Sequence, residues 1–263
     1  MTRRLKRSRN FEITLEIKND GFIRPPREAQ RNWLLKRAMA EFAADLAALD
    51  RLAAEFVPGT EAMHVGDREQ ADLSDAEIME DWQIPIMQAM ADVAAKSRGQ
   101  VLEIGYGRGV AARMIQAHEV ASHTIIECNR PIMRQCEQWR ATRPERDIRP
   151  VLGRWQDVLD GLGCFDSIFF HTYPLNEEEV LDQIGDEITF AAHFFSHAAR
   201  HLVDGGIFTY LSNEIDSLGR GHQRLLLQHF SSISMRCIAP LALPVDVRDA
   251  WWSDSMMLVS AVK

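Results

Sequence analysis

Three glycines at alternate positions are the first feature of the sequence that could do chemistry. The stretch QVLEIGYGRGVAARMIQ, residues 100–116, places Gly105, Gly107 and Gly109 between an apolar run and a helical pattern. Glycine lets a backbone turn sharply and lets a ligand approach the main chain without a Cβ in the way. The helix that follows offers free N–H groups. The stretch therefore predicts a ligand site beyond the carboxyl end of a strand in an α/β sheet.

The spacing of these glycines narrows the class of ligand. A dinucleotide fingerprint reads G-x-G-x-x-G, whereas the third glycine here comes one residue too early, and the sequence has no Gly-Lys-Ser/Thr phosphate loop. Glu127 follows Gly109 by eighteen residues, at the end of the next expected strand. A carboxylate there can accept hydrogen bonds from both ribose hydroxyls. The pattern indicates a nucleoside with a polar attachment that is not a phosphate, and S-adenosylmethionine fits that description.

The elements around this loop alternate between strand and helix from residue 100 to the end of the chain. Such alternation predicts an α/β fold with a doubly wound, mostly parallel sheet of seven strands and helices on both faces. The last two apolar runs, SMRCIAPLAL and SMMLVSAVK, predict a final antiparallel hairpin.

The N-terminal third has a different pattern. FEITLEI, residues 11–17, alternates like a strand, residues 28–56 are amphipathic and helical, and residues 57–72 read as a hinge. We therefore expect an N-terminal helical extension over residues 1–75, acting as a lid or dimerisation arm, and a catalytic domain over residues 76–263.

Composition excludes several classes of protein. The net charge of -8 argues against a general nucleic-acid binder. The sequence contains no run of 18 apolar residues, so no membrane span is expected. Four scattered cysteines without a CxxC pair are typical of reduced thiols in a cytoplasmic protein. His193, His197 and His201 recur at intervals of four, but they lack an H-E-x-x-H motif or a nearby cysteine pair, so no metal is expected.

Six segments carry a resemblance to a known family. MEDWQIPIM, VLEIGYGRGVAA, IIECN, GRWQDV, FDSIFFHTYPL and HAARHLVDGGIFTYLSN resemble the class I S-adenosylmethionine-dependent methyltransferases. More narrowly, they are similar to guanidinoacetate N-methyltransferase and the fungal arginine N-delta methyltransferases, over roughly residues 78–263. The resemblance implies a Rossmann-like methyltransferase fold, S-adenosylmethionine as methyl donor and S-adenosylhomocysteine as product.

The resemblance also implies a set of cofactor-binding residues. It assigns the methionine moiety to Glu103, Gly105 and Gly107, the ribose to Glu127 with Cys128 and Asn129 beside it, the adenine to Arg154 and Trp155, and closure over the cofactor to Met79, Trp82 and Met87.

Two positions depart from the family pattern. The family carries a Glu where this chain has Gln83 and an Asp where it has His171, and these two acids bind the guanidinium group. At about 4 Å each carboxylate contributes roughly 1 to 4 kcal/mol to holding a cation. The sequence therefore predicts that guanidinoacetate is a poor substrate.

The replaced pair leaves the acceptor open. Gln83 offers a donor and an acceptor without charge, and His171 can serve as a base or as a cation. The pair suits a neutral amine, imidazole or hydroxyl, or else a carboxylate that would become a methyl ester. Further substrate contacts are expected where strands end on the same edge, at Thr172, Tyr173, Ser212, Asn213 and Glu214, the last of which could restore a negative charge.

Three hypotheses for function follow from these residues. The first is methyl transfer to a nitrogen of a small molecule or peptide, with a homodimer as one expected assembly. The second is O-methylation that forms an ester or ether. The third is a scaffold that binds S-adenosylmethionine without catalysis, because both substrate acids are replaced.

Overall fold

The computed structural model describes residues 14–18, 72–175, 189–244 and 254–263. By contacts the chain divides into one unit of Met1–Asn19 with Val65–Lys263 and a second unit of Asp20–His64. The helix expected over residues 28–56 and nearly all of the expected hinge lie outside the described residues.

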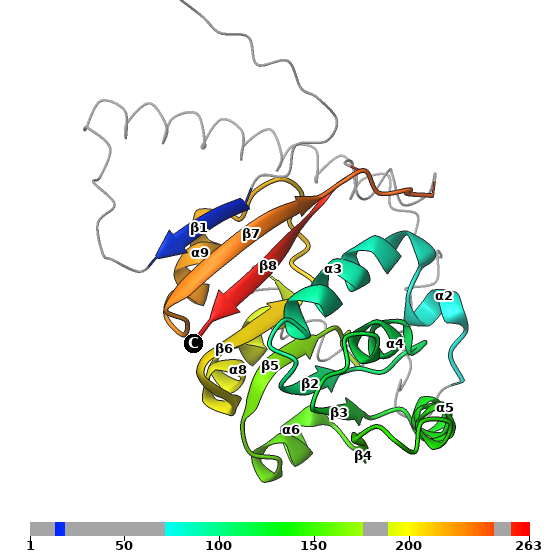
Figure 1. Cartoon of the computed structure of the whole chain (residues 1–263). Helices are drawn as coiled ribbons and strands as arrows, with labels where there is room; N and C mark the ends of the chain where they lie inside the picture. The colour runs from blue at the N-terminus through cyan, green and yellow to red at the C-terminus, as the bar shows by residue number, and fades with distance from the viewer. Residues whose placement is uncertain (1–13, 19–71, 176–188, 245–253) are drawn as a thin grey trace, which may run out of the picture. The chain divides into compact units, whose positions relative to one another are not determined.

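The core of the described chain is one mixed sheet with the strand order β1-β7-β8-β6-β5-β2-β3-β4 (Figure 1). Strands β2 to β6 pair in parallel, and β7 and β8 pair antiparallel to each other and to the rest, which confirms the mostly parallel, doubly wound fold and the final hairpin. The strands are β1 Thr14–Lys18, β2 Gln100–Ile104, β3 Ser122–Glu127, β4 Ile148–Leu152, β5 Phe165–Phe170, β6 Leu202–Tyr210, β7 Ser232–Ile238 and β8 Met256–Val262.

An eighth strand extends the predicted seven. β1, Thr14–Lys18, comes from the segment that the sequence assigned to the N-terminal extension, and it pairs antiparallel with β7. The register runs from Thr14 opposite Arg236 to Lys18 opposite Ser232. β1 therefore belongs to the same sheet as β2 to β6, because the strand β7 offers backbone groups for pairing.

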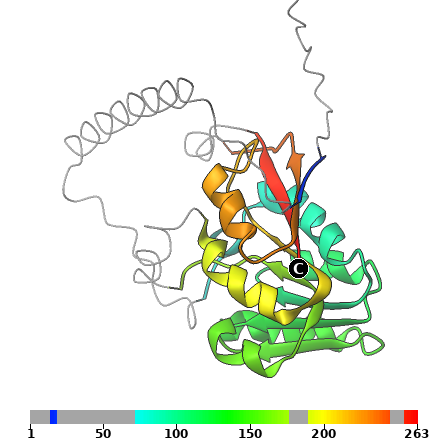
Figure 2. The same cartoon turned by 90° about the vertical axis from the view of Figure 1, so that its left-hand side faces the viewer.

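Helices cover both faces of the sheet. Figure 2 shows α8 and α9 on one face and α3 and α4 on the other. The described helices are α2 Asp75–Ile78, α3 Ile84–Ala94, α4 Val110–Gln116, α5 Arg130–Ala141, α6 Trp155–Val158, α8 Phe195–His201 and α9 Arg220–Leu226, with 3-10 turns η1 Asp81–Gln83, η2 Leu159–Gly161 and η3 Phe190–Phe194. None of these helices is long and apolar enough to cross a membrane.

The central strands are apolar on both faces because helices bury both. Residues 101–104 of β2 and all of β3 are buried. Leu102 and Ile104 pack with the side chains of α6, α8 and α9, whereas Val101 packs with α3 and α4. Pro85 lies in the first turn of α3, where a missing N–H costs no hydrogen bond. This packing fixes the carboxyl ends of β2, β3 and β5 side by side.

Candidate active site

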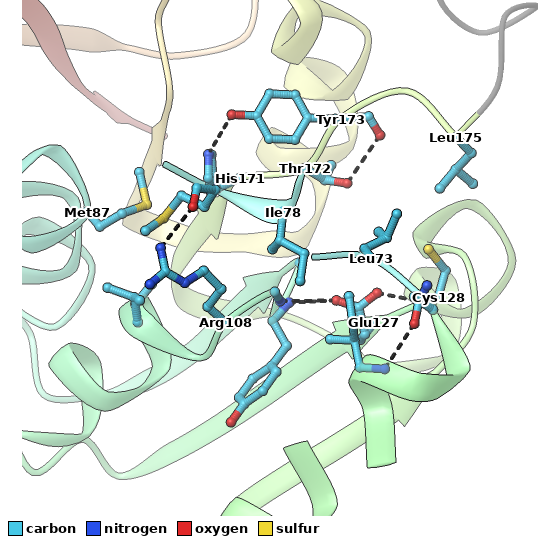
Figure 3. A pocket seen from close by; sticks show the side chains of 18 residues that line it. Leu73, Ile78, Met87, Arg108, Glu127, Cys128, His171, Thr172, Tyr173 and Leu175 are labelled. Atoms are coloured by element: carbon cyan, nitrogen blue, oxygen red, sulfur yellow. Dashed lines mark hydrogen bonds between the residues drawn. The ribbon is translucent and has the colours of Figure 1, made fainter. Parts of the chain in front are cut away.

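A cleft of about 680 Å³ lies where β2, β3 and β5 end. Its walls come from the loop after β2, the residues after β3, the segment 171–175 after β5 and the segment that contains α2 (Figure 3). Figure 3 shows Met87 and His171 toward one end of the cleft and Glu127 and Cys128 toward the other. The cleft therefore occupies the edge of the sheet at which α/β folds bind ligands.

The glycines of the loop after β2 are required by the backbone. Gly105, Gly107 and Gly109 have φ of 90°, 52° and 66°, in the region that side chains disfavour. A Cβ at Gly105 would collide with the carbonyl oxygen of His171, and one at Gly109 would collide with the Tyr106 ring. The loop can therefore pass close to the end of β5, and it exposes main chain to the cleft.

Glu127 is held rigidly at the cleft wall. Its Oε2 accepts hydrogen bonds from the backbone N–H groups of Tyr106 at 2.9 Å and Gly107 at 3.3 Å, and its Oε1 accepts one from Asn129 at 2.8 Å. Burial raises the pKa of Glu127, while these N–H groups lower it. A carboxylate fixed in this way at the edge of the cleft fits a ribose diol.

A second hollow of about 390 Å³ adjoins the cleft and shares Gly105, Glu127 and Cys128 with it. Arg154 and Trp155 line this hollow as well. The Trp155 indole is 9% exposed and offers a flat apolar surface. The residues present therefore fit a nucleoside, with the ribose at Glu127 and the base beside Trp155.

The segment that contains α2 is tied to the glycine loop by Arg108. Its Nη1 donates to the Met79 carbonyl oxygen at 2.9 Å and to Asp81 Oδ1 at 2.7 Å, and its Nε lies 3.6 Å from Asp75 Oδ2. Met79 and Met87 line the cleft, and so do several residues that sequence reasoning missed, among them Leu73, Ile78 and Arg108. The sequence held one signal for the Arg108 contacts, which was an arginine between two glycines together with acidic residues at positions 75 and 81.

His171, Tyr173 and Gln83 form a chain of contacts at the end of the cleft near Met87. The Gln83 Nε2 donates to the Tyr173 hydroxyl at 3.2 Å, and that hydroxyl lies 3.3 Å from His171 Nε2. The Gln83 Oε1 is buried, and no group among the described residues donates to it. Desolvation by the surrounding protein lowers the pKa of His171 to about 4, so the imidazole is neutral at pH 7.

The family profile of guanidinoacetate N-methyltransferase matches residues 60–234, which is more than half of the chain. The chain belongs to this family. It is thus a class I S-adenosylmethionine-dependent methyltransferase by family and fold.

Curated relatives of this methyltransferase include two fungal proteins. Protein arginine N-methyltransferase 2 of Yarrowia lipolytica is 26% identical over 147 residues, covering 51% of this chain and 28% of the relative. The protein of the same name from Eremothecium gossypii is 32% identical over 116 residues, covering 40% of this chain and 27% of the relative. The matched part therefore spans little more than a quarter of the length of these relatives.

A solved spermidine synthase, in complex with the transition-state analogue AdoDATO, shares the fold. The TM-score is 0.50 at 16% identity, over 69% of the methyltransferase chain and 61% of the synthase chain. At this identity the likeness concerns the architecture of the sheet and helices alone.

Two residues assigned to the cofactor do not reach the cleft of the methyltransferase. Glu103 has no exposed surface, and its Oε2 lies 2.8 Å from His123 Nε2 beneath the glycine loop. Alternation along β2 turns its side chain toward α4 and α5, away from the ligand edge. Trp82 is buried among the side chains of α3 and donates to Glu80 Oε2 at 2.6 Å, and it does not line the cleft.

Of the predicted substrate residues, Thr172 and Tyr173 line the cleft, and Asn213 lines a neighbouring hollow. The other two do not. Ser212 is fully buried and donates to the Met257 carbonyl oxygen at 2.6 Å. Glu214 Oε1 accepts from Gly219 N–H at 3.0 Å and lies 3.1 Å from His222 Nδ1, so it is committed to α9 and does not restore the missing charge.

The three histidines spaced by four have separate contacts. His201 lies 2.8 Å from the Gly163 carbonyl oxygen and 3.1 Å from Asp160 Oδ1. The rings of His193 and His197 pack on Trp155, at centroid distances of 5.6 and 5.0 Å. Within the described ranges, no group of three or more His, Cys, Asp or Glu side chains is arranged to hold a metal ion.

Proposed function

We propose that this protein transfers a methyl group from S-adenosylmethionine to an uncharged nitrogen of a small molecule or peptide other than guanidinoacetate. The observation that carries the proposal is a single cleft lined by both Glu127 and His171. The Glu127 end fits a nucleoside, and the imidazole of His171 at the other end is neutral. S-adenosylmethionine supplies an activated methyl group on a sulfonium, so the protein has mainly to position a lone pair behind that group.

We infer that nitrogen is the methylated atom because the imidazole of His171 is neutral. A neutral amine or imidazole already has a lone pair and needs no base before attack. A hydroxyl needs a base, and an imidazole with a pKa of about 4 is a weak one. A carboxylate acceptor would need His171 as a cation, which the same low pKa disfavours at pH 7. The fungal relatives, which are named protein arginine N-methyltransferase 2, also support nitrogen as the methylated atom.

The exclusion of guanidinoacetate follows from charge. Gln83 and His171 stand where the family carries two acids, and neither is negative here. Burying a guanidinium without an anionic partner costs several kcal/mol, on the order of the penalty for any unpaired buried charge. Hydrogen bonds from Gln83 and Tyr173 suit an uncharged group instead.

Two measurements, made one after the other, test the proposal. Isothermal titration of the full chain with S-adenosylmethionine should give saturable binding, and the bound ligand should raise the Tm. Transfer of a labelled methyl group to a metabolite and peptide extract, followed by mass spectrometry, should then give products labelled on nitrogen. Absence of binding at millimolar ligand would refute the methyltransferase proposal, and products labelled only on oxygen would refute the choice of nitrogen.

We also propose that the segment of residues 1–75 helps to close the cleft over the cofactor. This is supported by Leu73, which belongs to that segment and lines the cleft. Leu73→Ala should weaken S-adenosylmethionine binding, measured by titration. Unchanged affinity in a variant that retains its Tm would refute the role.

A further inference from the structure

A third hollow of about 530 Å³ lies on the other side of the segment after β5. The nine described residues that line it are Phe170, His171, Thr172, Tyr173, Pro174, Phe190, Ala191, Leu211 and Asn213. Neither the glycine loop nor Glu127 is among these lining residues, and the hollow shares Thr172, Tyr173 and Phe190 with the second hollow beside Trp155.

The hollow and the cleft share one wall. His171, Thr172 and Tyr173 line both, so these three residues stand between the two spaces. Tyr173 is held in this wall through its hydroxyl, by Gln83 on one side and His171 on the other. A molecule that occupies the hollow therefore meets the methyl-transfer site at the His171 and Tyr173 side chains.

The walls of the hollow are mostly aromatic and aliphatic. Phe170 is 2% exposed and stacks on Phe194 with ring centroids 4.6 Å apart, which fixes its ring. The ring centroid of Phe190 lies 6.3 Å from that of Phe170. Ala191 and Leu211 complete the apolar surface. Rings in such a frame favour a further aromatic group through edge-to-face or offset contacts.

The hollow offers hydrogen bonds but no negative charge. Among the described residues that line it none is acidic, and its polar groups are His171, Thr172, Tyr173 and Asn213. A cationic acceptor would lose its hydration here without gaining a partner of opposite charge. An uncharged N–H or ring nitrogen can instead exchange hydrogen bonds with the imidazole and the phenol.

We infer that the methyl acceptor carries its uncharged nitrogen on an aromatic or branched aliphatic group, which occupies the hollow between Phe170, Phe190 and Leu211. The inference rests on the proposed function and names the substrate class of the same site. The nitrogen lone pair forms the new N–C bond as the C–S bond of the sulfonium breaks, and the bonding pair goes to sulfur. The nitrogen then releases its proton to His171 or to water.

The experiment uses the full chain loaded with S-adenosylhomocysteine. Binding of 4-phenylimidazole and benzimidazole, which are uncharged at pH 8, is measured by titration beside guanidinoacetate and agmatine, which both carry a guanidinium group. We expect the two aromatic compounds to bind at least tenfold more tightly than the two guanidinium compounds. Tighter binding of the guanidinium compounds, or no binding of the aromatic pair at millimolar concentration, overturns the inference.

Two variants that change the volume of the hollow in opposite directions locate the site. Ala191→Leu fills it and should weaken 4-phenylimidazole binding at least tenfold, whereas Leu211→Ala enlarges it and should favour 4-phenylimidazole over the smaller benzimidazole. Both variants should bind S-adenosylhomocysteine like the parent chain, since neither residue lines the cleft. If neither substitution alters the binding of the aromatic pair, the hollow is not the acceptor site. Loss of S-adenosylhomocysteine binding by the parent chain would instead refute the proposed function.

Discussion

The side-chain amide of Gln83 donates a hydrogen bond of 3.2 Å to the hydroxyl of Tyr173, across 90 residues of sequence. The same hydroxyl lies 3.3 Å from Nε2 of His171. Gln83 and His171 are therefore joined through a third side chain. If the amide donates to the phenol oxygen, the phenol proton is free to point at the imidazole, which leaves the hydrogen of that ring on Nδ1.

Removing the phenol oxygen should separate catalysis from cofactor binding. Tyr173→Phe leaves the ring in place but removes the partner of both Gln83 and His171, at a cost of about 1–3 kcal/mol for unmade hydrogen bonds. We expect kcat to fall about tenfold or more, with the Kd for S-adenosylmethionine nearly unchanged. Tyr210→Phe is the comparison, because the Tyr210 hydroxyl contacts His222 at 2.5 Å within the core. That variant should lower the Tm and spare kcat.

The carboxylate of Glu127 should control the affinity for S-adenosylmethionine. Glu127→Gln keeps the shape but removes the charge, and hydrogen bonds to a charged group contribute about 1.5–3 kcal/mol. The Kd measured by titration should therefore rise about 10- to 100-fold. The matched control is Glu119→Gln, at a side chain that is 68% exposed on the surface. Equal affinities of the two variants would show that Glu127 does not contact the ligand.

Gly105 should tolerate no side chain. Gly105→Ala places a Cβ at φ of 90° and against the His171 carbonyl oxygen. Backbone strain of this kind costs about 1–3 kcal/mol before the collision is counted. Urea unfolding should show that loss, together with weakened S-adenosylmethionine binding. Gly161→Ala is the control, because a Cβ there meets no atom within 4 Å. It should leave the free energy of unfolding within about 0.5 kcal/mol of the parent.

His171 should make stability depend on pH between about 4 and 6.5. Its folded pKa of about 4 lies below the ordinary value of 6.5, so the unfolded chain binds a proton over this window and the folded chain does not. The free energy of unfolding should therefore rise with pH across the window, and this contribution should be lost as pH falls toward 4. His171→Gln should flatten the slope. His197 and His222, whose pKa values are also lowered, remain in both proteins and cancel in the comparison.

The pH dependence of the reaction should carry the same signature. With His171 neutral throughout, kcat should show no step attributable to it between pH 6 and pH 8. A step near pH 6.5 that disappears in His171→Gln would contradict this assignment.

Much of the fold and of the donor site could be predicted because the signals are local. The strands β2, β3 and β5 were evident from residues 101–104, 122–127 and 165–170, because short β-rich segments there alternate with helical patterns. The positive φ of Gly105 leaves a trace in the sequence, since glycine is nearly the only residue that accepts it. The place of Glu127 could be predicted because it ends the next strand along the chain after the glycine loop.

The predictions that did not hold depended on which way a side chain turned. Glu103 and Glu127 each stand near the end of a strand, yet alternation turns Glu103 toward His123 in the interior and leaves Glu127 at the cleft. Glu214 follows β6 as expected, but His222 and the Gly219 N–H draw its carboxylate away from the acceptor. A local pattern cannot report these choices, because the competing partners belong to other elements.

The sequence by itself determined the doubly wound sheet and the glycine loop, and the resemblance it carries implies two acids at the positions of Gln83 and His171. Only the tertiary structure decided that Tyr173 joins those two side chains and that an apolar hollow lies beyond them. The physical reason is that propensity and periodicity act over a few neighbouring residues. Hydrogen bonds and desolvation at the site act between segments that meet only when the sheet has formed.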